Sequence, residues 1–192
     1  TAQMDGADLE LWEIDAPVNL WKTEDAQKLL KCYNVVDYVT MPNPGQVWSY
    51  IGGWLYQAHL KEIEDNVPEQ LRSYYNSCAL RMSIALSSFG KDLKNEAGAM
   101  PIGAEANADA LGGKTHVIIR ARDMAAYVQK LLGDPDYADG QDTGYCSPQP
   151  GDIIVFAGKG HAGMCPGDNI SIGSFLTGPI WLINRATLKD AE

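Results

Sequence analysis

The chain has 192 residues, of which 45% are hydrophobic and 21% are charged, as in an ordinary globular protein. We expect residues 1–192 to form a single domain, with residues 1–40 as an N-terminal arm and helix packed on the body. The formal net charge of -10 disfavours nucleic acid and anionic membrane surfaces as partners. No apolar run approaches the roughly 20 residues of a membrane-spanning helix.

The N-terminal region predicts a short helix. Thr23 and the two acidic residues after it provide a helix cap and an acidic first turn, so the helix should run through residues 26–36. The sequence MPNPG at residues 41–45 ends this segment, because proline and glycine interrupt both helices and strands.

An aromatic stretch follows over residues 46–60. Its paired glycines, Gly52 and Gly53, predict a tight bend or a close approach of another backbone segment. His59 lies near the end of this stretch in an amphipathic context, beside charged residues. We therefore expect His59 to lie at the surface rather than to serve as a catalytic base.

The segment from residue 74 to residue 90 carries the most informative pattern. Asn76 and Ser77 are good N-cap residues directly before Cys78, apolar residues recur after it at helical spacing, and Gly90 provides the stop. This pattern predicts a helix with one buried face. A thiol at its start lies beside unpaired backbone N–H groups and the positive end of the helix macrodipole, and both favour the thiolate. Cys78 is either a nucleophile or a buried core residue, and a histidine base elsewhere would favour the first interpretation.

The next region predicts a loop, a strand and a helix. Residues 91–116 are rich in alanine, glycine and charge, so we expect a long excursion over the surface. His116 opens a predicted strand, where an ordinary strand-edge histidine is the expected role. Residues 122–132 predict a helix that Gly133 closes.

The C-terminal region predicts an antiparallel meander. Residues 153–158 are β-branched and aromatic, a glycine-rich turn leads to a second strand that begins with His161, and residues 178–185 predict a last strand. Helices therefore come first and antiparallel strands follow, which is the order of an α+β fold.

His161 is the best candidate for the base of Cys78. It follows a strong strand through a glycine-rich turn, and its small neighbours leave room for a substrate. A third group should orient the imidazole from the following turn, where Asp168 is the first candidate and Asn169 the second. The backbone N–H of Cys78 could stabilise an oxyanion.

Two other uses of the cysteines need to be considered. Cys146, His161 and Cys165 are zinc-type ligands, but their spacing matches no compact zinc pattern, so we expect no metal and no cofactor. Cys146 and Cys165 flank a predicted strand and could instead form a disulfide.

The helix pattern carries a resemblance to a known family. YNSCALRMSIAL at residues 75–86 resembles the Asn-Thr-Cys-Ala-[Ile/Leu]-Arg-[Met/Leu]-Ser-x-Ala-Leu motif of type VI secretion amidase effectors, most closely the Tae4 family. Three further segments resemble the family in the expected order: IGG at 51–53, the helix ending in Gly-x-Pro at 120–136, and the histidine strand at 151–164. Together they cover most of residues 47–168.

The resemblance implies a papain-like α+β fold of the NlpC/P60 kind, with the catalytic cysteine at the start of a central helix packed on the sheet that carries the histidine. It implies that Cys78 is the nucleophile and His161 the base of an amidase domain. The third residue of the family lies further along, at a spacing that reaches residues 171–173, and none of these is acidic. Asp168, with Asn169 as the alternative, therefore stays the predicted orienter.

The resemblance also implies a substrate and partners. The substrate would be peptidoglycan, cleaved between D-glutamate and meso-diaminopimelate in the stem peptide, and a cognate immunity protein would plug the cleft. The protein would be secreted or delivered to the periplasm of a target bacterium as an antibacterial toxin. The same mechanism on the diaminopimelate to D-alanine cross-bridge remains open, as does a catalytically silent relative that binds the cell wall or a partner protein.

Overall fold

The computed structural model describes residues 23–137, 151–158, 160–167 and 179–184. The helices precede the larger antiparallel sheet, with the short strands β1 and β2 between α5 and α6, so the predicted α+β class is confirmed. In chain order the elements are α2 (Thr23–Tyr33), α3 (Pro44–Ile51), α4 (Gly53–Glu64), η1 (Glu69–Leu71), α5 (Cys78–Phe89), β1 (Ala99–Pro101), η2 (Ala108–Leu111), β2 (His116–Ile118), α6 (Ala121–Leu132), β3 (Ile153–Ala157), β4 (Ala162–Pro166) and β5 (Ile180–Ile183).

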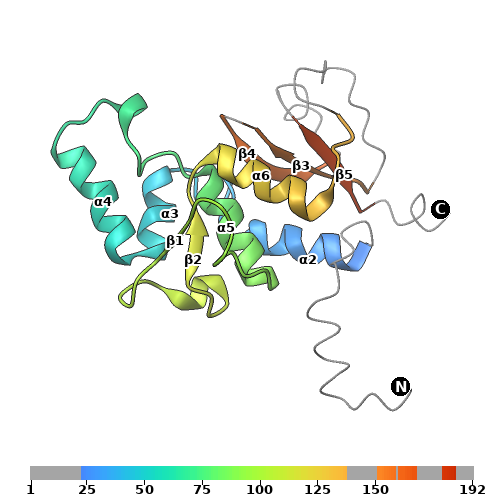
Figure 1. Ribbon diagram of the computed structural model, residues 1–192, viewed down its shortest axis with the longest axis horizontal. Helices are drawn as coiled ribbons and strands as arrows, with labels where there is room; N and C mark the ends of the chain where they lie inside the picture. The colour runs from blue at the N-terminus through green and yellow to red at the C-terminus, as the bar shows by residue number, and fades with distance from the viewer. Residues whose placement is uncertain (1–22, 138–150, 159, 168–178, 185–192) are drawn as a thin grey trace, which may run out of the picture.

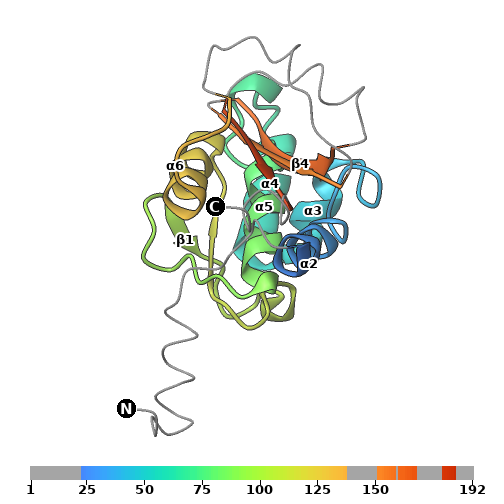
Figure 2. The ribbon, with the colours of Figure 1, turned by 90° about the vertical axis from the view of Figure 1, so that its right-hand side faces the viewer.

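Helix α5 is the central element of the fold, and α2, α6, β2, β4 and η2 pack around it (Figures 1 and 2). It begins at Cys78 and ends before Gly90, as predicted. Residues 78–87 are all buried, so the expectation of a single buried face is wrong. The helix is enclosed on every side, which is the environment of a core helix.

The larger sheet covers one side of this core. Its strand order is β4-β3-β5, and both pairings are antiparallel. The three predicted strands are confirmed, but the predicted meander is wrong, because β5 pairs with β3 and not with β4. All five residues of β3 are buried, and a buried strand needs a hydrogen-bonded neighbour on both edges.

The sheet has two distinct apolar faces, as the period of two along a strand requires. Residues that pack with α2, α5 and α6 alternate with residues of a smaller cluster on the opposite face. The inner set is Ile153, Val155, Ala157, Ala162, Met164, Trp181 and Ile183. The outer set is Ile154, Phe156, Cys165, Ile180 and Leu182.

The segment 91–116 is not the surface excursion that its composition predicts. It contains β1, which pairs antiparallel with β2, and the short helix η2. Its few large apolar side chains, among them Leu93, Ile102 and Leu111, are buried. A low apolar content therefore hid a segment that contributes to the core.

The two glycines at the start of α4 behave as predicted. Gly52 and Gly53 have φ values of 66° and 63°, and a Cβ atom at Gly53 would lie 2.9 Å from the Cβ of Ala106. Helix α3 begins inside MPNPG, since Pro44 occupies its first turn and Asn43 and Gln46 form a capping box. Helix α2 already ends at Tyr33, well before Pro42, so MPNPG starts the next helix rather than ending α2.

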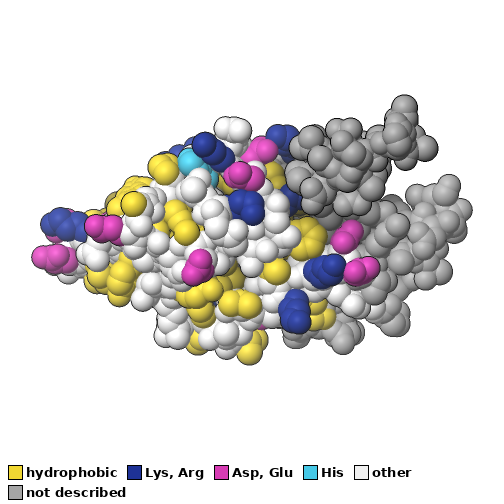
Figure 3. Space-filling view, turned by 90° about the horizontal axis from the view of Figure 1, so that it is seen from below, with side chains coloured by type: hydrophobic (Ala, Val, Ile, Leu, Met, Phe, Trp, Pro, Cys, Tyr) yellow, Lys and Arg dark blue, Asp and Glu magenta, His cyan; other side chains and the backbone are white. Residues whose placement is uncertain are grey.

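One face of the molecule shows how its surface charge is distributed. Basic, acidic and apolar side chains are interspersed on it (Figure 3). Trp54, Leu60 and Ile63 of α4 are among the exposed apolar residues. Within the described ranges, every helix is too short or too polar to cross a bilayer.

Candidate active site

Cys78 is the first residue of α5, and only 2% of its surface is exposed. Its backbone N–H donates to Oδ1 of Asn76 at 3.1 Å. The other predicted cap residue, Ser77, does not cap the helix with its side chain, because its Oγ accepts a hydrogen bond from Nε of Arg81 at 2.8 Å. Asn76 is therefore the residue that holds the turn into the helix.

His161 lies in the hairpin between β3 and β4, directly before β4. The hairpin is closed by a hydrogen bond from the Gly158 N–H to the His161 carbonyl at 2.9 Å. The N–H of the next residue, Ala162, interacts with the sulfur of Cys78 and favours its thiolate. The hairpin thus brings His161 to the N-terminus of α5.

The exposed imidazole of His161 is held by aromatic neighbours. Its ring centre lies 5.2 Å from that of Phe156 and 6.0 Å from that of Tyr38. In the part of the chain that the structure describes, the hydrogen bonds to histidine rings belong to His59 and His116. The resting ring is therefore positioned by packing, and catalytic hydrogen bonds commonly tighten only when substrate binds.

The electrostatics of the pair differ from the expected thiolate. Burial raises the pKa of the Cys78 thiol above its usual value, and this outweighs the lowering effects of nearby backbone N–H groups and of Arg81. Although the residue as a whole is exposed, partial desolvation of its ring by the packed neighbours, with a smaller effect of Arg81, lowers the pKa of His161. Both shifts favour the neutral forms, a thiol and a neutral imidazole, so the helix N-terminus does not by itself produce a thiolate.

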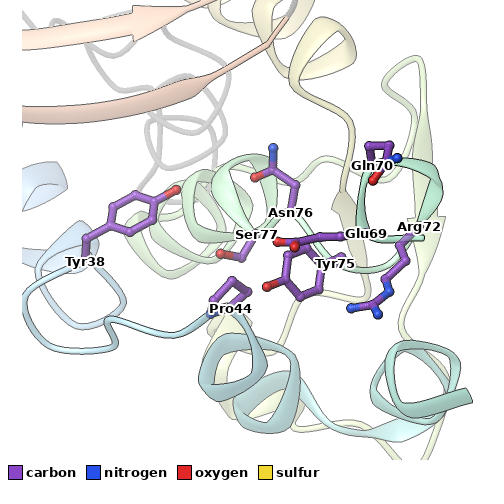
Figure 4. Close-up of a pocket in the computed structure, with 8 residues that line it drawn as sticks. All are labelled: Tyr38, Pro44, Glu69, Gln70, Arg72, Tyr75, Asn76 and Ser77. Atoms are coloured by element: carbon purple, nitrogen blue, oxygen red, sulfur yellow. The ribbon is translucent and has the colours of Figure 1, made fainter. Parts of the chain in front are cut away.

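Arg81 and Tyr38 are site residues that sequence reasoning missed. Arg81 is fully buried, and its Nη1 donates to the carbonyls of Val36 at 2.8 Å and Met41 at 2.6 Å. Its guanidinium lies 3.8 Å from the centre of the Tyr38 ring, and the Tyr38 hydroxyl points toward Ser77 (Figure 4). The loop between α2 and α3 is thereby fixed against the start of α5. The sequence signal that could have identified Arg81 is the presence of an arginine within an otherwise apolar helix pattern.

The prediction that His59 lies at the surface is wrong. His59 is 3% exposed, its Nδ1 lies 2.6 Å from the carbonyl oxygen of Tyr74, and its ring stacks on Trp48 and Tyr75. It therefore anchors the segment that leads into Cys78. His116 lies in the paired strand β2, opposite Pro101, in the structural role expected of it.

Several predicted residues cannot be placed. Asp168, Asn169 and Cys146 lie outside the described residues, so the imidazole orienter and the disulfide with Cys165 stay predictions. The described residues contain no group of three or more His, Cys, Asp or Glu side chains suited to hold a metal ion. This does not test the zinc alternative, because one of its ligands is Cys146.

A groove runs past the N-terminus of α5. One cavity of about 630 Å³ has Tyr38, Glu69 and Tyr75 in its wall (Figure 4), and a second, of about 480 Å³, includes Cys78. Arg72 and Asn76 line both cavities, so the two form adjoining arms of one groove. A cysteine at a helix start, a histidine hairpin and an open groove are parts from which an acyl-transfer site can be built.

The comparisons with known proteins agree with this arrangement. Residues 74–167 match the family Tae4, type VI secretion system (T6SS) amidase effector protein 4. A search of curated proteins found no match.

Solved structures resemble the chain over most of its length. The crystal structure of the type VI effector Tae4 from Enterobacter cloacae matches with a TM-score of 0.53 and 19% identity, over 84% of this chain and 96% of that one. The Tae4–Tai4 effector-immunity complex from the same organism matches with a TM-score of 0.52 and 20% identity, over 79% of this chain and 95% of that one. Tae4 from Salmonella typhimurium, in complex with the immunity protein Tai4 from Enterobacter cloacae, matches with a TM-score of 0.50 and 21% identity, over 81% of this chain and 96% of that one.

At these identities the structural matches establish the fold, and the family match covers the segment from Tyr74 to Gly167 that contains Cys78 and His161. The chain is therefore Tae4-like: residues 74–167 match the type VI secretion amidase effector family, and its fold is that of solved Tae4 structures.

Proposed function

We propose that the chain is a cysteine hydrolase that cleaves the D-glutamyl to meso-diaminopimelate bond of peptidoglycan stem peptides and acts as an antibacterial lytic effector. The observation that carries the proposal is the convergence of Cys78 and the His161 hairpin beside an open groove in a Tae4-like fold. Under this proposal residues 1–192 form one amidase domain, and the fold is of the papain-like NlpC/P60 kind.

The first half of the reaction forms an acyl-enzyme. The neutral imidazole of His161 accepts the thiol proton, and the sulfur of Cys78 attacks the amide carbon, so that a C–S bond forms and the carbonyl electron pair moves to oxygen. When the C–N bond breaks, His161 returns the proton to the leaving amine. Because the thiol pKa is raised, proton transfer accompanies attack rather than preceding substrate binding.

The backbone N–H of Cys78 is the proposed oxyanion donor. In the resting structure it donates to the neutral amide oxygen of Asn76 at 3.1 Å. A developing oxyanion carries more charge than that amide oxygen, so it is the stronger acceptor and would replace it.

The second half of the reaction hydrolyses the thioester. His161 accepts a proton from water, the resulting hydroxide attacks the acyl carbon, and the thiolate leaves and takes the proton back. The products are a carboxylic acid and a free amine. Asp168, or alternatively Asn169, is proposed to orient the imidazole through its other ring nitrogen.

A cognate immunity protein is the proposed partner. Tae4 of Enterobacter cloacae is known in an effector-immunity complex with Tai4, and we propose that a corresponding protein covers the groove of this chain. The site of action would be the periplasm of the target bacterium, where stem peptides are accessible.

Digestion of purified sacculi tests the substrate. The proposal predicts new diaminopimelate amines and new D-glutamate carboxyl groups, identified by mass spectrometry of the released muropeptides. Products cut between diaminopimelate and D-alanine would replace the proposed bond with the cross-bridge. Binding to sacculi without any cleavage would replace the enzyme with a catalytically silent relative.

A further inference from the structure

The arm of the groove that includes Cys78 has an unusual charge. Its wall contains Arg72, Arg120 and Arg122, and none of the described residues that line it is acidic. The chain as a whole carries a formal charge of -10. A locally basic wall on an acidic protein points to an anionic group in the ligand that this arm receives.

The two arginines at the start of α6, Arg120 and Arg122, are available to a ligand. Arg120 and Arg122 are exposed, and the ion pairs in the described part of the chain involve Lys28, Lys61 and Lys130 instead. The carboxylate of Asp123, which follows them, packs against Gly98, outside the wall of the groove.

Arg72 marks the boundary between the two arms. Its Nε donates to the carbonyl of Val67 at 2.9 Å, and its guanidinium lies 5.1 Å from the centre of the Tyr75 ring. These contacts hold it in place. The other arm has the carboxylate of Glu69 in its wall, so the groove is basic on the Cys78 side and mixed on the other.

The start of α6 adds to the positive field. Arg120 is the N-cap residue, and no side chain caps this helix. The first backbone N–H groups of a helix have no acceptor within it, and the macrodipole is positive there. The arm therefore combines free guanidinium donors with free backbone donors, and both types bind carboxylates.

We propose that this arginine arm binds a carboxylate of the substrate next to the scissile amide. The inference rests on the proposed function, since the stem peptide presents free carboxylates on both residues that flank the bond. Guanidinium groups bind carboxylates in a bidentate geometry, so the arm would orient the peptide relative to the sulfur of Cys78 as well as attract it.

Equilibrium binding tests the inference. The Cys78→Ala chain, which cannot turn the peptide over, is titrated with the synthetic tripeptide L-Ala-γ-D-Glu-meso-diaminopimelate and with two analogues. One analogue has a carboxamide in place of the D-glutamyl carboxylate, and the other has carboxamides on diaminopimelate. We expect one of them to bind about tenfold or more weakly than the free acid, which identifies the carboxylate that is bound.

Substitution of the arginines completes the test. R120Q/R122Q in the same background should lower the affinity for the free acid about tenfold and remove the difference in affinity between the peptides. R120K/R122K keeps the charge and should retain part of the affinity and part of that difference. The matched control K28Q/K61Q removes the same charge from exposed positions on α2 and α4. It should change neither the affinity for the free acid nor the difference in affinity between the peptides. Circular dichroism confirms that each variant is folded.

The outcomes separate the two proposals. Equal affinity for the three peptides, a preference that survives R120Q/R122Q, or no binding at all overturns the arginine arm. Cleavage of the free acid by the wild-type chain with arginine-independent binding overturns the arm and leaves the proposed function standing. Arginine-dependent binding without cleavage by the wild-type chain overturns the proposed function and leaves the arginine arm standing.

Discussion

The two halves of the proposed catalytic pair are held in different ways. Cys78 is enclosed at the start of a helix that the core surrounds. His161 is exposed, and its ring is held by packing against Phe156 and Tyr38. Core packing thus fixes the proposed nucleophile, whereas a hairpin and the neighbouring loop position the proposed base. Damage to the supports of the base should reduce catalysis with little loss of stability, and damage to the core should reduce both.

The largest expected effect comes from removing the base. His161→Ala should lower kcat/KM on stem peptides by about 10³-fold, because general base catalysis contributes about 10²–10⁴-fold. Since His161 is exposed, the free energy of unfolding of the variant in urea should stay near that of the wild-type chain. A loss of stability comparable to that of a core variant would contradict the difference between the two halves.

The pH dependence of the wild-type chain sharpens this prediction. Protonated imidazole cannot accept the thiol proton, so activity falls as pH drops through the pKa of His161. Burial and Arg81 lower that pKa, and activity should therefore persist to more acidic pH than an unperturbed histidine would allow. The acidic limb of the kcat/KM profile measures this, and a limb above the usual histidine pKa would contradict it.

Arg81 links the two halves and should affect both stability and activity. Arg81→Leu leaves the carbonyls of Val36 and Met41 without their donor, and each unsatisfied buried acceptor costs about 1–3 kcal/mol. We expect a total loss of about 3 kcal/mol in urea unfolding. Arg81→Lys keeps the charge but not the several donors of the guanidinium, so it should lose less stability than Arg81→Leu. If both variants were as stable as the wild type, the buried contacts of Arg81 would be dispensable.

The smallest expected effect concerns the ring that supports His161. Tyr38→Ala removes that ring and should lower kcat about tenfold, by the geometric sensitivity of positioned catalytic groups. Tyr38→Phe keeps the ring and should stay close to wild type. Equal kcat values for the two variants would exclude a role of the ring in positioning the imidazole.

Local signals account for what the sequence predicted correctly. The start of α5 carries Asn76 and Ser77, its end carries Gly90, and the hairpin before His161 has a strand followed by a glycine-rich turn. Each of these patterns lies within a few residues of the element that it specifies.

Features that depend on distant contacts escaped prediction. The burial of His59 depends on Trp48 and Tyr75, the pairing of β5 depends on which edge of β3 is open, and the role of Arg81 depends on Val36 and Met41. The raised pKa of Cys78 has the same origin, because burial is a property of the assembled core.

The central claim is that Cys78 attacks the stem peptide, and purified sacculi test it most directly. Wild-type chain and Cys78→Ala are incubated with the same sacculi, and new diaminopimelate amines are counted by mass spectrometry of the released muropeptides. The wild-type chain should release them, and Cys78→Ala, folded by circular dichroism, should release at least about 10³-fold fewer per unit time. Release by Cys78→Ala at the wild-type rate would contradict the claim.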